Sequence, residues 1–361
     1  METERRRMIA NGNEDNPAGA YLFLPDGEAK ELKKQQSDWI VVEGDLVRRV
    51  FTSPINDLKI LQTYTLYQGL PWIDLDNEVD IRSKENFELA LRFSSSVNSG
   101  DEFFTDLNGM QMIKRRRQAK LPTQANFYPM AAGVFIEDDA TRLSIHSAQA
   151  LAVSSLASGH IEIMLDRRLR HIEIMLDRRL SSDDNRGLQQ GVRDNKRTVA
   201  HFRIVVEPIH GAAKTEERVG FHSSVGHLAT WSLHYPVVKM IGEATPKSVS
   251  SKNFEQELNC DLHVVTFRTL ASPTTYEANE RSTAAERKSA LVMHRVVPDC
   301  RSRLSLPDTS CLNTGYEFEP LKLISTLKNA KSTSLTNLYE GNKSEQFALQ
   351  PNDVSTILVS F

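Results

Sequence analysis

Two tandem units rich in charged residues are the first candidates for chemistry in this sequence. His160–Arg170 reads HIEIMLDRRLR and His171–Ser181 reads HIEIMLDRRLS, so ten of eleven positions match. The carboxylates of this stretch are Asp166, Asp177, Asp183 and Asp184. Two carboxylates can act as a general acid and a general base, but an aspartate beside an arginine more often forms a structural ion pair. We therefore expect no independent active site in the tandem units.

The histidines between the middle and the last third of the chain do not have the spacing of metal ligands. They are His210, His222, His227 and His234, separated by 12, 5 and 7 residues. None of these intervals is the i, i+4 spacing that places two metal ligands on one face of a helix. No carboxylate or cysteine lies at ligand spacing from these histidines, as a zinc site would require. We predict no metal site and no cofactor in this chain.

Cysteine use is sparse and odd in number, which excludes a disulfide framework. The three cysteines are Cys260, Cys300 and Cys311. Cys300 and Cys311 could pair across a hairpin in an oxidising compartment or remain reduced, and the sequence leaves both open. Asn342 begins the sequon Asn-Lys-Ser, a possible glycosylation site that matters only in the secretory pathway.

Composition is that of an ordinary globular protein and excludes several classes of partner. The 361 residues are 40% apolar and 25% charged, with a net charge of −3. A charge near zero argues against nucleic-acid binding, and the basic run Lys114–Arg117 is expected to be a solvated loop. No apolar stretch is long enough for a membrane span. The charged N-terminus has no signal-peptide pattern, which by itself favours the cytoplasm.

Short β-rich segments separated by turns predict an all-β fold. Segments 39–42, 46–51, 56–68, 142–150 and 200–206 are expected to be strands. Phe87–Phe93 alternates strictly, which predicts apolar residues facing inward and Glu88, Ala90 and Arg92 facing water. The sequence therefore predicts a large antiparallel β-sandwich with few helices. We expect an unstructured start at 1–15, a main lobe at 16–208, a linker at 209–258 and a C-terminal lobe at 259–361.

Several long motifs resemble glycoside hydrolase family 38, the Golgi-type alpha-mannosidase II. The family's G-A-Y-L-F-L-P-[DN]-G motif matches Gly19–Gly27, and its F-Y-T-D-L-N-G motif resembles Phe103–Gly109 with Phe104 in place of tyrosine. Its L-P-L-Q-A-N-x-Y-P-M motif resembles Leu121–Met130. The strand motif ending in D-R-R-L, followed by D-D-N-R-G-L, is similar to Glu173–Leu188. Cys260–Arg268 resembles a further strand motif, so the resemblance covers nearly the whole chain.

The resemblance implies a part of a larger enzyme that hydrolyses alpha-mannosyl linkages in N-glycan processing in the Golgi lumen. It maps onto the family's C-terminal β-sandwich, whereas the zinc ligands, the nucleophile and the general acid belong to an N-terminal catalytic domain that this sequence lacks. We therefore expect zinc in that domain and no activity from this chain alone. The expected partners are that domain and a mannose-containing glycan. The alternative is a non-catalytic module that binds carbohydrate or a protein partner.

The resemblance also implies which residues line the mannose pocket. These are Tyr21, Asp177, Arg178 and Arg179, or the duplicate set Asp166, Arg167 and Arg168 in place of the last three. We favour the second copy because it keeps the spacing to the loop beyond the arginines.

Two units are too few for a repeat architecture, and eleven extra residues in one continuous strand would exchange its two faces. The extra copy is therefore expected to loop out or to be absent from the natural protein. The face toward the missing domain is expected to be apolar.

Overall fold

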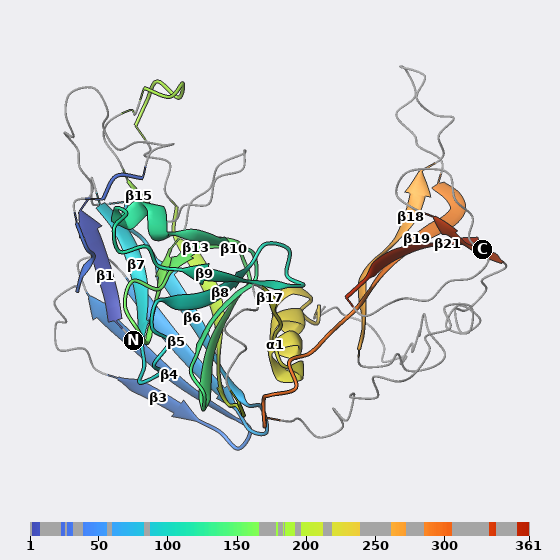
Figure 1. The fold of residues 1–361 in the computed structure, drawn as a ribbon, viewed down its shortest axis with the longest axis horizontal. Helices are drawn as coiled ribbons and strands as arrows, with labels where there is room; N and C mark the ends of the chain where they lie inside the picture. Colours follow the sequence, from blue (N-terminus) through green and yellow to red (C-terminus); the bar gives the residue numbers. More distant parts are fainter. Residues whose placement is uncertain are drawn as a thin grey trace, which may run out of the picture. The chain divides into compact units, whose positions relative to one another are not determined.

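The computed structural model of the protein is built almost entirely from β-strands (Figure 1). It describes residues 2–7, 23–25, 27–31, 39–55, 60–82, 87–165, 178–179, 183, 185–191, 196–211, 219–238, 261–271, 285–304, 332–336 and 352–360. The chain forms two compact units, the first made of Met1–Val237 with Asp299–Leu306 and the second of Val238–Pro298 with Pro307–Phe361. The chain therefore returns to the first unit for one short segment before it completes the second.

The first unit is a sandwich of two antiparallel sheets. The smaller sheet contains, in spatial order, β10 (Tyr128–Met130), β13 (Leu151–Ser154), β14 (His160–Met164), β7 (Phe87–Ser94), β1 (Glu2–Arg7) and β2 (Lys30–Glu31), with β15 (Arg178–Arg179) also paired to β7. The larger sheet contains β17 (Val219–Gly220), β9 (Met112–Arg116), β8 (Glu102–Asp106), β11 (Gly133–Glu137), β12 (Thr141–Ser147), β16 (Thr198–Pro208), β6 (Trp72–Val79), β5 (Ile60–Tyr67), β4 (Val47–Ile55) and β3 (Ile40–Glu43). The predicted all-β antiparallel sandwich is confirmed.

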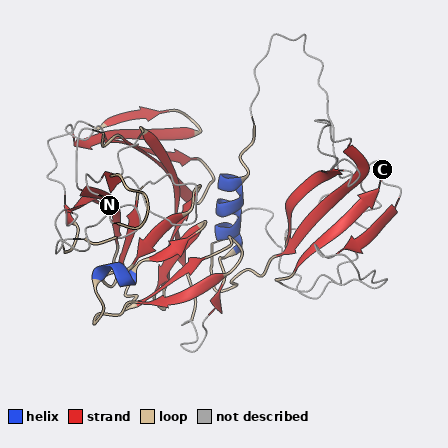
Figure 2. Ribbon diagram, turned by 90° about the horizontal axis from the view of Figure 1, so that it is seen from above, coloured by secondary structure: helices blue, strands red, loops and turns tan. Residues whose placement is uncertain are grey.

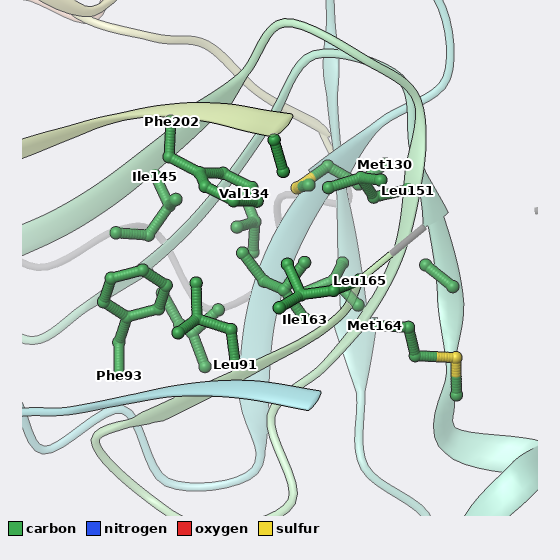
Figure 3. Packing of buried hydrophobic residues seen from close by; sticks show 14 of the residues in the cluster. Leu91, Phe93, Met130, Val134, Ile145, Leu151, Ile163, Met164, Leu165 and Phe202 are labelled. Atoms are coloured by element: carbon green, nitrogen blue, oxygen red, sulfur yellow. The ribbon is translucent and has the colours of Figure 1, made fainter. Parts of the chain in front are cut away.

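The core of the sandwich consists of alternate residues from both sheets, because successive side chains on a strand point to opposite faces. Leu91 of β7 and Ile163 of β14 belong to the same buried cluster as Val134 of β11, Ile145 of β12 and Phe202 of β16 (Figure 3). Burial of this apolar surface stabilises the fold by roughly 25 cal/mol per Å². The two sheets therefore hold each other in place through one shared apolar layer.

The turn after β8 is fixed by the carboxylate of Asp106, which is almost fully buried. Its Oδ1 accepts hydrogen bonds from the backbone N–H groups of Ala132 (2.9 Å) and Gly133 (2.8 Å), and its Oδ2 accepts one from Gly109 (2.6 Å). A buried carboxylate is stabilised by such charge-assisted bonds. The motif that carries the family resemblance here therefore acts structurally, by tying β8 to the start of β11.

The only α-helix among the described residues is α1 (Ser224–His234), drawn in blue in Figure 2. It packs on β12 and β16. The Ser223 side chain caps its first turn by accepting a hydrogen bond from the Gly226 N–H. In the middle of the helix, Arg203 Nη1 donates to the Ala229 carbonyl at 2.8 Å, which ties α1 to β16. The helix was not predicted because its buried face contains glycine, alanine, threonine and histidine rather than a run of large apolar residues.

A buried ion network holds the returning segment 299–306 in the first unit. Arg142, whose side chain is inaccessible to solvent, bonds to Glu137 at 2.5 Å and also to Asp299. Arg301 binds the same two carboxylates at 2.9 and 2.7 Å. Although burial alone would raise the pKa of Asp299, the Arg301 hydrogen bond and the Arg142 charge lower it to about 2. Two arginines and two carboxylates thus compensate one another's charge.

The second unit contains a four-stranded antiparallel sheet. Its strands, in spatial order, are β18 (Leu262–Ala271), β19 (Ala285–Arg295), β21 (Val354–Ser360) and β20 (Ser332–Thr336). Within it, Arg295 of β19 forms an ion pair with Asp261 at 3.0 Å. The strand predicted at Cys260–Arg268 is present as β18, although Cys260 itself lies outside the described residues.

Three expectations about organisation require correction. Strand β1 stands where we expected an unstructured start, because pairing with β7 uses backbone groups and needs no apolar alternation. The expected linker 209–258 contains β17 and α1, and both belong to the first unit. The basic run Lys114–Arg117 lies largely in β9 rather than in a loop, and Lys114 binds Glu102 at 3.0 Å.

Candidate functional site

Strands β14 and β15 occupy the same edge of β7. Over Phe87–Arg92, one edge of β7 pairs with β1. The other edge pairs with β14 from Ser94 to Ala90, and β15 pairs with Glu88 and Phe87. A strand has only two edges, so β15 must lie on the edge that β14 uses. It continues the line of β14 along β7.

The strand along this edge therefore takes its residues from both copies of the tandem unit. The Leu165 N–H donates to the Leu89 carbonyl at 3.3 Å, and Arg178 is the partner of Glu88, the next residue of β7. The twelve intervening residues, 166–177, lie outside the described residues. Copy one supplies the strand and copy two supplies the arginine pair.

The polar face of this strand group is buried. Glu88 of β7 and Glu162 of β14 are each 1% exposed, and Glu162 accepts a hydrogen bond from Arg92 at 2.7 Å. The expectation that Glu88, Ala90 and Arg92 face water is wrong, because Ala90 is fully buried and the Arg92 side chain is mostly buried as well. Charged side chains tolerate this only when ionic or hydrogen-bonded partners surround them.

The sheet register places opposite charges in facing positions along this strand group. Arg92 faces Glu162, and Glu88 faces Arg178. Directly opposed residues of an antiparallel pair lie on the same side of the sheet. Guanidinium and carboxylate groups in such an arrangement donate and accept hydrogen bonds in fixed directions. Because Glu88 and Glu162 are almost inaccessible to solvent, this face belongs to the interior of the protein, and it offers no described nucleophile with an activating base.

The structure describes only some of the residues predicted for the site. Arg178 and Arg179 form β15. The others lie outside the described residues, so their roles remain predictions: Tyr21, Asp166, Arg167, Arg168, Asp177, Cys311 and Asn342. Cys300 is exposed, and its pairing with Cys311 is untested.

The loop after β15 has an unusual backbone. Asn185, Gln189 and Gly187 all have positive φ, at 56°, 60° and 110°. Non-glycine residues seldom adopt this conformation. Asp183 Oδ2 accepts a hydrogen bond from the Asn185 N–H at 3.0 Å, which makes this carboxylate part of the turn. A hydrogen bond within the loop therefore supports this uncommon backbone conformation, and such conformations are frequent at binding sites.

Sequence reasoning missed Glu88, Arg92 and Glu162. A polar position on an alternating strand has the same sequence pattern whether its side of the sheet is exposed to solvent or buried. Only the pairing of β7 with β14, which brings residues 92 and 162 together, reveals the buried ion pair. No signal in a single sequence would have identified these three residues.

The histidines do not assemble into a metal centre. No group of three or more potential ligands that could hold a metal ion occurs within the part of the chain that the structure describes. Instead, His146, His222 and His227 are buried between α1 and the larger sheet, with ring centroids of neighbouring pairs 4.8 and 5.7 Å apart. His210 and His234 are exposed.

The buried histidines should make folding sensitive to acid. Burial, helped by the charges of Arg203 and His227, lowers the pKa of His146 to about 3, and burial also lowers the pKa of His222 well below its usual 6.5. Their neutral forms stabilise the fold fully above pH 6.5, and this contribution is lost as pH falls from 6.5 toward 3. For His146 alone, the free energy of unfolding should be about 2 kcal/mol lower at pH 5 than at pH 7.5. Urea unfolding at the two pH values measures the loss.

Substitution separates this effect from general acid unfolding. His146→Gln should lower stability at both pH values but reduce the difference between them. His201→Gln is the control, because the hydrogen bond to Asp76 raises the pKa of His201 and gives its contribution the opposite sign. A pH difference that is unchanged in His146→Gln would contradict the explanation.

Removing the eleven or twelve residues between Leu165 and the arginine pair should leave the sandwich folded. Deletion of 166–177 joins Leu165 directly to Arg178, the next position along β7. Deletion of 166–176 leaves Asp177 as one extra residue, which a β-bulge can accommodate. Because a shorter connection loses less closure entropy, we expect both variants to unfold within about 3 °C of the parent. Thermal circular dichroism tests this, and loss of cooperative unfolding in either deletion would contradict the composite strand.

Comparison with known proteins identifies similar sequences over nearly the whole chain. A family model described as the glycosyl hydrolases family 38 C-terminal domain matches residues 5–186. Alpha-mannosidase 2 of Rattus norvegicus is 32% identical over 360 residues, covering 95% of this chain and 30% of the relative. Alpha-mannosidase 2x of Mus musculus is 36% identical, covering 94% and 29%. Alpha-mannosidase 2 of Drosophila melanogaster is 42% identical over 226 residues, covering 62% and 19%.

The fold is also similar to that of solved structures. An alpha-mannosidase from Enterococcus faecalis V583 aligns with a TM-score of 0.59 and 12% identity, covering 100% of this chain and 38% of that chain. The present chain spans about 30% of the length of the rat and mouse relatives. Among the described residues, no helix has the length and apolar character needed to cross a membrane.

Proposed function

Because the chain belongs to glycosyl hydrolase family 38, whose C-terminal domain it carries, we propose that it forms one wall of a mannosyl-binding site that a catalytic domain completes. The observation that carries this proposal is the pairing of β15, formed by Arg178 and Arg179, with β7, where Arg178 lies opposite the buried Glu88. The proposed wall consists of Tyr21, Asp177, Arg178 and Arg179.

The role of these groups is to position the sugar. Guanidinium groups donate hydrogen bonds to hydroxyl oxygens, and the strand register puts Arg178 opposite the buried Glu88. Holding a substrate in a reactive geometry contributes to the rate without any bond being made by the holding group. The bond-making carboxylates and the zinc ion belong to the catalytic domain in this proposal. The chain alone then has no turnover.

The proposed substrate is an alpha-mannosyl linkage of an N-glycan, and the proposed compartment is the Golgi lumen. The names of the relatives, alpha-mannosidase 2 and 2x, support the substrate class. Binding of a mannose-containing glycan without any catalytic partner would instead favour a carbohydrate-binding module. The experiment therefore has to separate binding from turnover.

Complementation tests the proposal. This chain is co-expressed with the part of rat alpha-mannosidase 2 that precedes the matched region, and zinc-dependent hydrolysis of an aryl alpha-mannoside is measured. We expect activity only when both parts are present. Arg178→Ala should lower kcat/KM by roughly 10–100-fold, the value of a charged hydrogen bond. Arg116→Ala, an exposed residue of β9, is the matched control. Equal activity of Arg178→Ala and the parent complex would overturn the role of the arginine pair.

A further inference from the structure

Arg115 of β9 lies on the inner face of the larger sheet. It is the direct partner of Phe103 of β8, and directly opposed residues share a side of the sheet. Phe103 is fully buried in the core of the sandwich, whereas Arg115 is half-buried. Arg115 therefore lies at the rim of the apolar layer, where a charge is costly unless a partner compensates it.

Arg115 differs from the mostly buried arginines of this protein in having no carboxylate partner within the described part of the chain. Each of the others forms an ion pair: Arg92, Arg142, Arg203 and Arg295. Burial lowers the pKa of Arg115, and the phenol of Tyr128 offsets only part of that shift. A partly desolvated cation without a counter-ion in the protein is a candidate for a binding site.

Contacts from both sheets fix the orientation of the Arg115 guanidinium group. Its Nε donates a hydrogen bond to Oγ1 of the fully buried Thr105 at 3.0 Å. Its Cζ lies 4.9 Å from the centroid of the Tyr128 ring, which belongs to β10 of the smaller sheet. The Tyr128 ring in turn packs edge-on against Phe103, with ring centroids 5.7 Å apart. These contacts use Nε and one face of the guanidinium group, which leaves the N–H donors of Nη1 and Nη2 for a ligand.

The Nη donors suit a ligand with paired oxygens, because a guanidinium group binds an oxyanion through two parallel hydrogen bonds. The surroundings favour an anion with more than one charge. Segment 114–120 contains five basic residues and no acidic one. Within the described part of the chain, only two of the five form ion pairs, Lys114 with Glu102 and Arg117 with Asp101. A doubly charged anion therefore meets an excess of positive charge here.

A neutral sugar is a weaker candidate, because the guanidinium group covers one face of the Tyr128 ring on which a sugar would stack. We propose that Arg115, held by Thr105 and Tyr128, binds a phosphate or sulfate group through its Nη1 and Nη2 donors. Two sources share this chemistry, a free ion and an ester carried on a sugar. The anion site is formed by β8, β9 and β10 and does not depend on the mannosyl-binding role of β15.

Isothermal titration calorimetry of the full chain with sodium phosphate, and separately with sodium sulfate, tests the anion site at constant ionic strength. We expect saturable binding with a dissociation constant on the order of 1 mM, the strength of a few charge-assisted hydrogen bonds. Arg115→Gln should weaken binding by roughly tenfold or more. Arg115→Lys should weaken it as well, because lysine keeps the charge but cannot present two parallel donors.

Arg116→Gln is the matched control, because it removes the same charge from the exposed, opposite side of β9. It should change the affinity by less than about twofold. The proposal would be overturned by the absence of saturable binding of either anion, by equal affinities of the parent and Arg115→Gln, or by equal losses in Arg115→Gln and Arg116→Gln.

Thermal unfolding separates a binding role of Arg115 from a structural one. Without phosphate, Arg115→Gln should unfold within about 4 °C of the parent, because no described ion pair is lost. Phosphate should raise the Tm of the parent and of Arg116→Gln, since a ligand that binds only the folded state stabilises it. It should not raise the Tm of Arg115→Gln. If that variant fails to fold, Arg115→Lys provides the same comparison, and an undiminished phosphate effect in Arg115→Lys would contradict the paired-donor site.

Titration with glucose 6-phosphate identifies the source of the bound group. An affinity higher than that for inorganic phosphate by roughly threefold or more assigns the site to a sugar ester. An equal or lower affinity assigns it to the free ion. Glucose itself should not bind, and binding of glucose that Arg115→Gln abolishes would overturn the choice of an anion.

Discussion

Replacing Gly159 with alanine should lower the free energy of unfolding by roughly 3–5 kcal/mol, because two effects add. Gly159 has a φ of +76°, which L-residues other than glycine disfavour. A Cβ at this position would lie 2.5 Å from the Ser95 carbonyl oxygen and 2.9 Å from that of Val97. Backbone atoms cannot move aside as a flexible side chain could. Urea unfolding of the purified chain measures the change.

Gly100→Ala is the matched control for this clash. Gly100 also has a positive φ, at +58°, but nothing lies within 4 Å of the Cβ that alanine would add. Gly100→Ala should therefore lower the free energy of unfolding only through the unfavourable backbone conformation, by about 1–2 kcal/mol. Because Gly159 immediately precedes β14, its substitution should also displace the strand on which the arginine pair depends. Equal losses in the two variants would show that the carbonyl contacts are unimportant.

Replacing Arg142 with methionine should lower the free energy of unfolding by about 3–5 kcal/mol, the usual result of breaking a buried ion pair. Arg142 is fully buried, binds Glu137 and Asp299, and lies 4.1 Å from the centroid of the Phe135 ring. Its loss leaves Arg301 alone to compensate two buried carboxylates. Chemical unfolding with tryptophan fluorescence as the probe measures the effect.

The exposed pair between Arg48 and Glu43 provides the comparison. Both side chains are more than half exposed, so Arg48→Met should change stability by less than about 1 kcal/mol. Limited proteolysis adds a local measurement, because Asp299–Leu306 returns to the first unit through Asp299. Faster cleavage near Asp299 is expected in Arg142→Met alone. The same stability for both variants would contradict a structural role for the buried network.

The sequence predicted the fold class because strand signals are local. Alternation in Phe87–Phe93 and the β-branched run at 39–42 identify strands without knowledge of their partners. Helix α1 was missed because glycine, threonine and histidine occupy its buried face. Strand β1 was missed because its residues are polar and its formation depends on β7, which is far away in the sequence.

The candidate site was predictable only in part. Resemblance predicted the arginine pair as pocket residues, which stays a prediction, and the structure shows only that the pair forms β15, which is paired with β7. The buried pair of Arg92 and Glu162 joins residues 70 positions apart, which no local pattern encodes. The prediction that the extra copy loops out or is absent from the natural protein concerns residues outside the described ones, so it stays a prediction. Which copy contributes which part depends on the pairing of β7.

The central claim is that this chain positions a mannosyl group and makes no bond itself. The most direct measurement is hydrolysis of an aryl alpha-mannoside by the purified chain alone, with and without added zinc. The account predicts no turnover above that of buffer in either condition. Zinc-dependent turnover by the isolated chain, abolished by a chelator, would contradict it, because the chain would then hold a catalytic centre of its own.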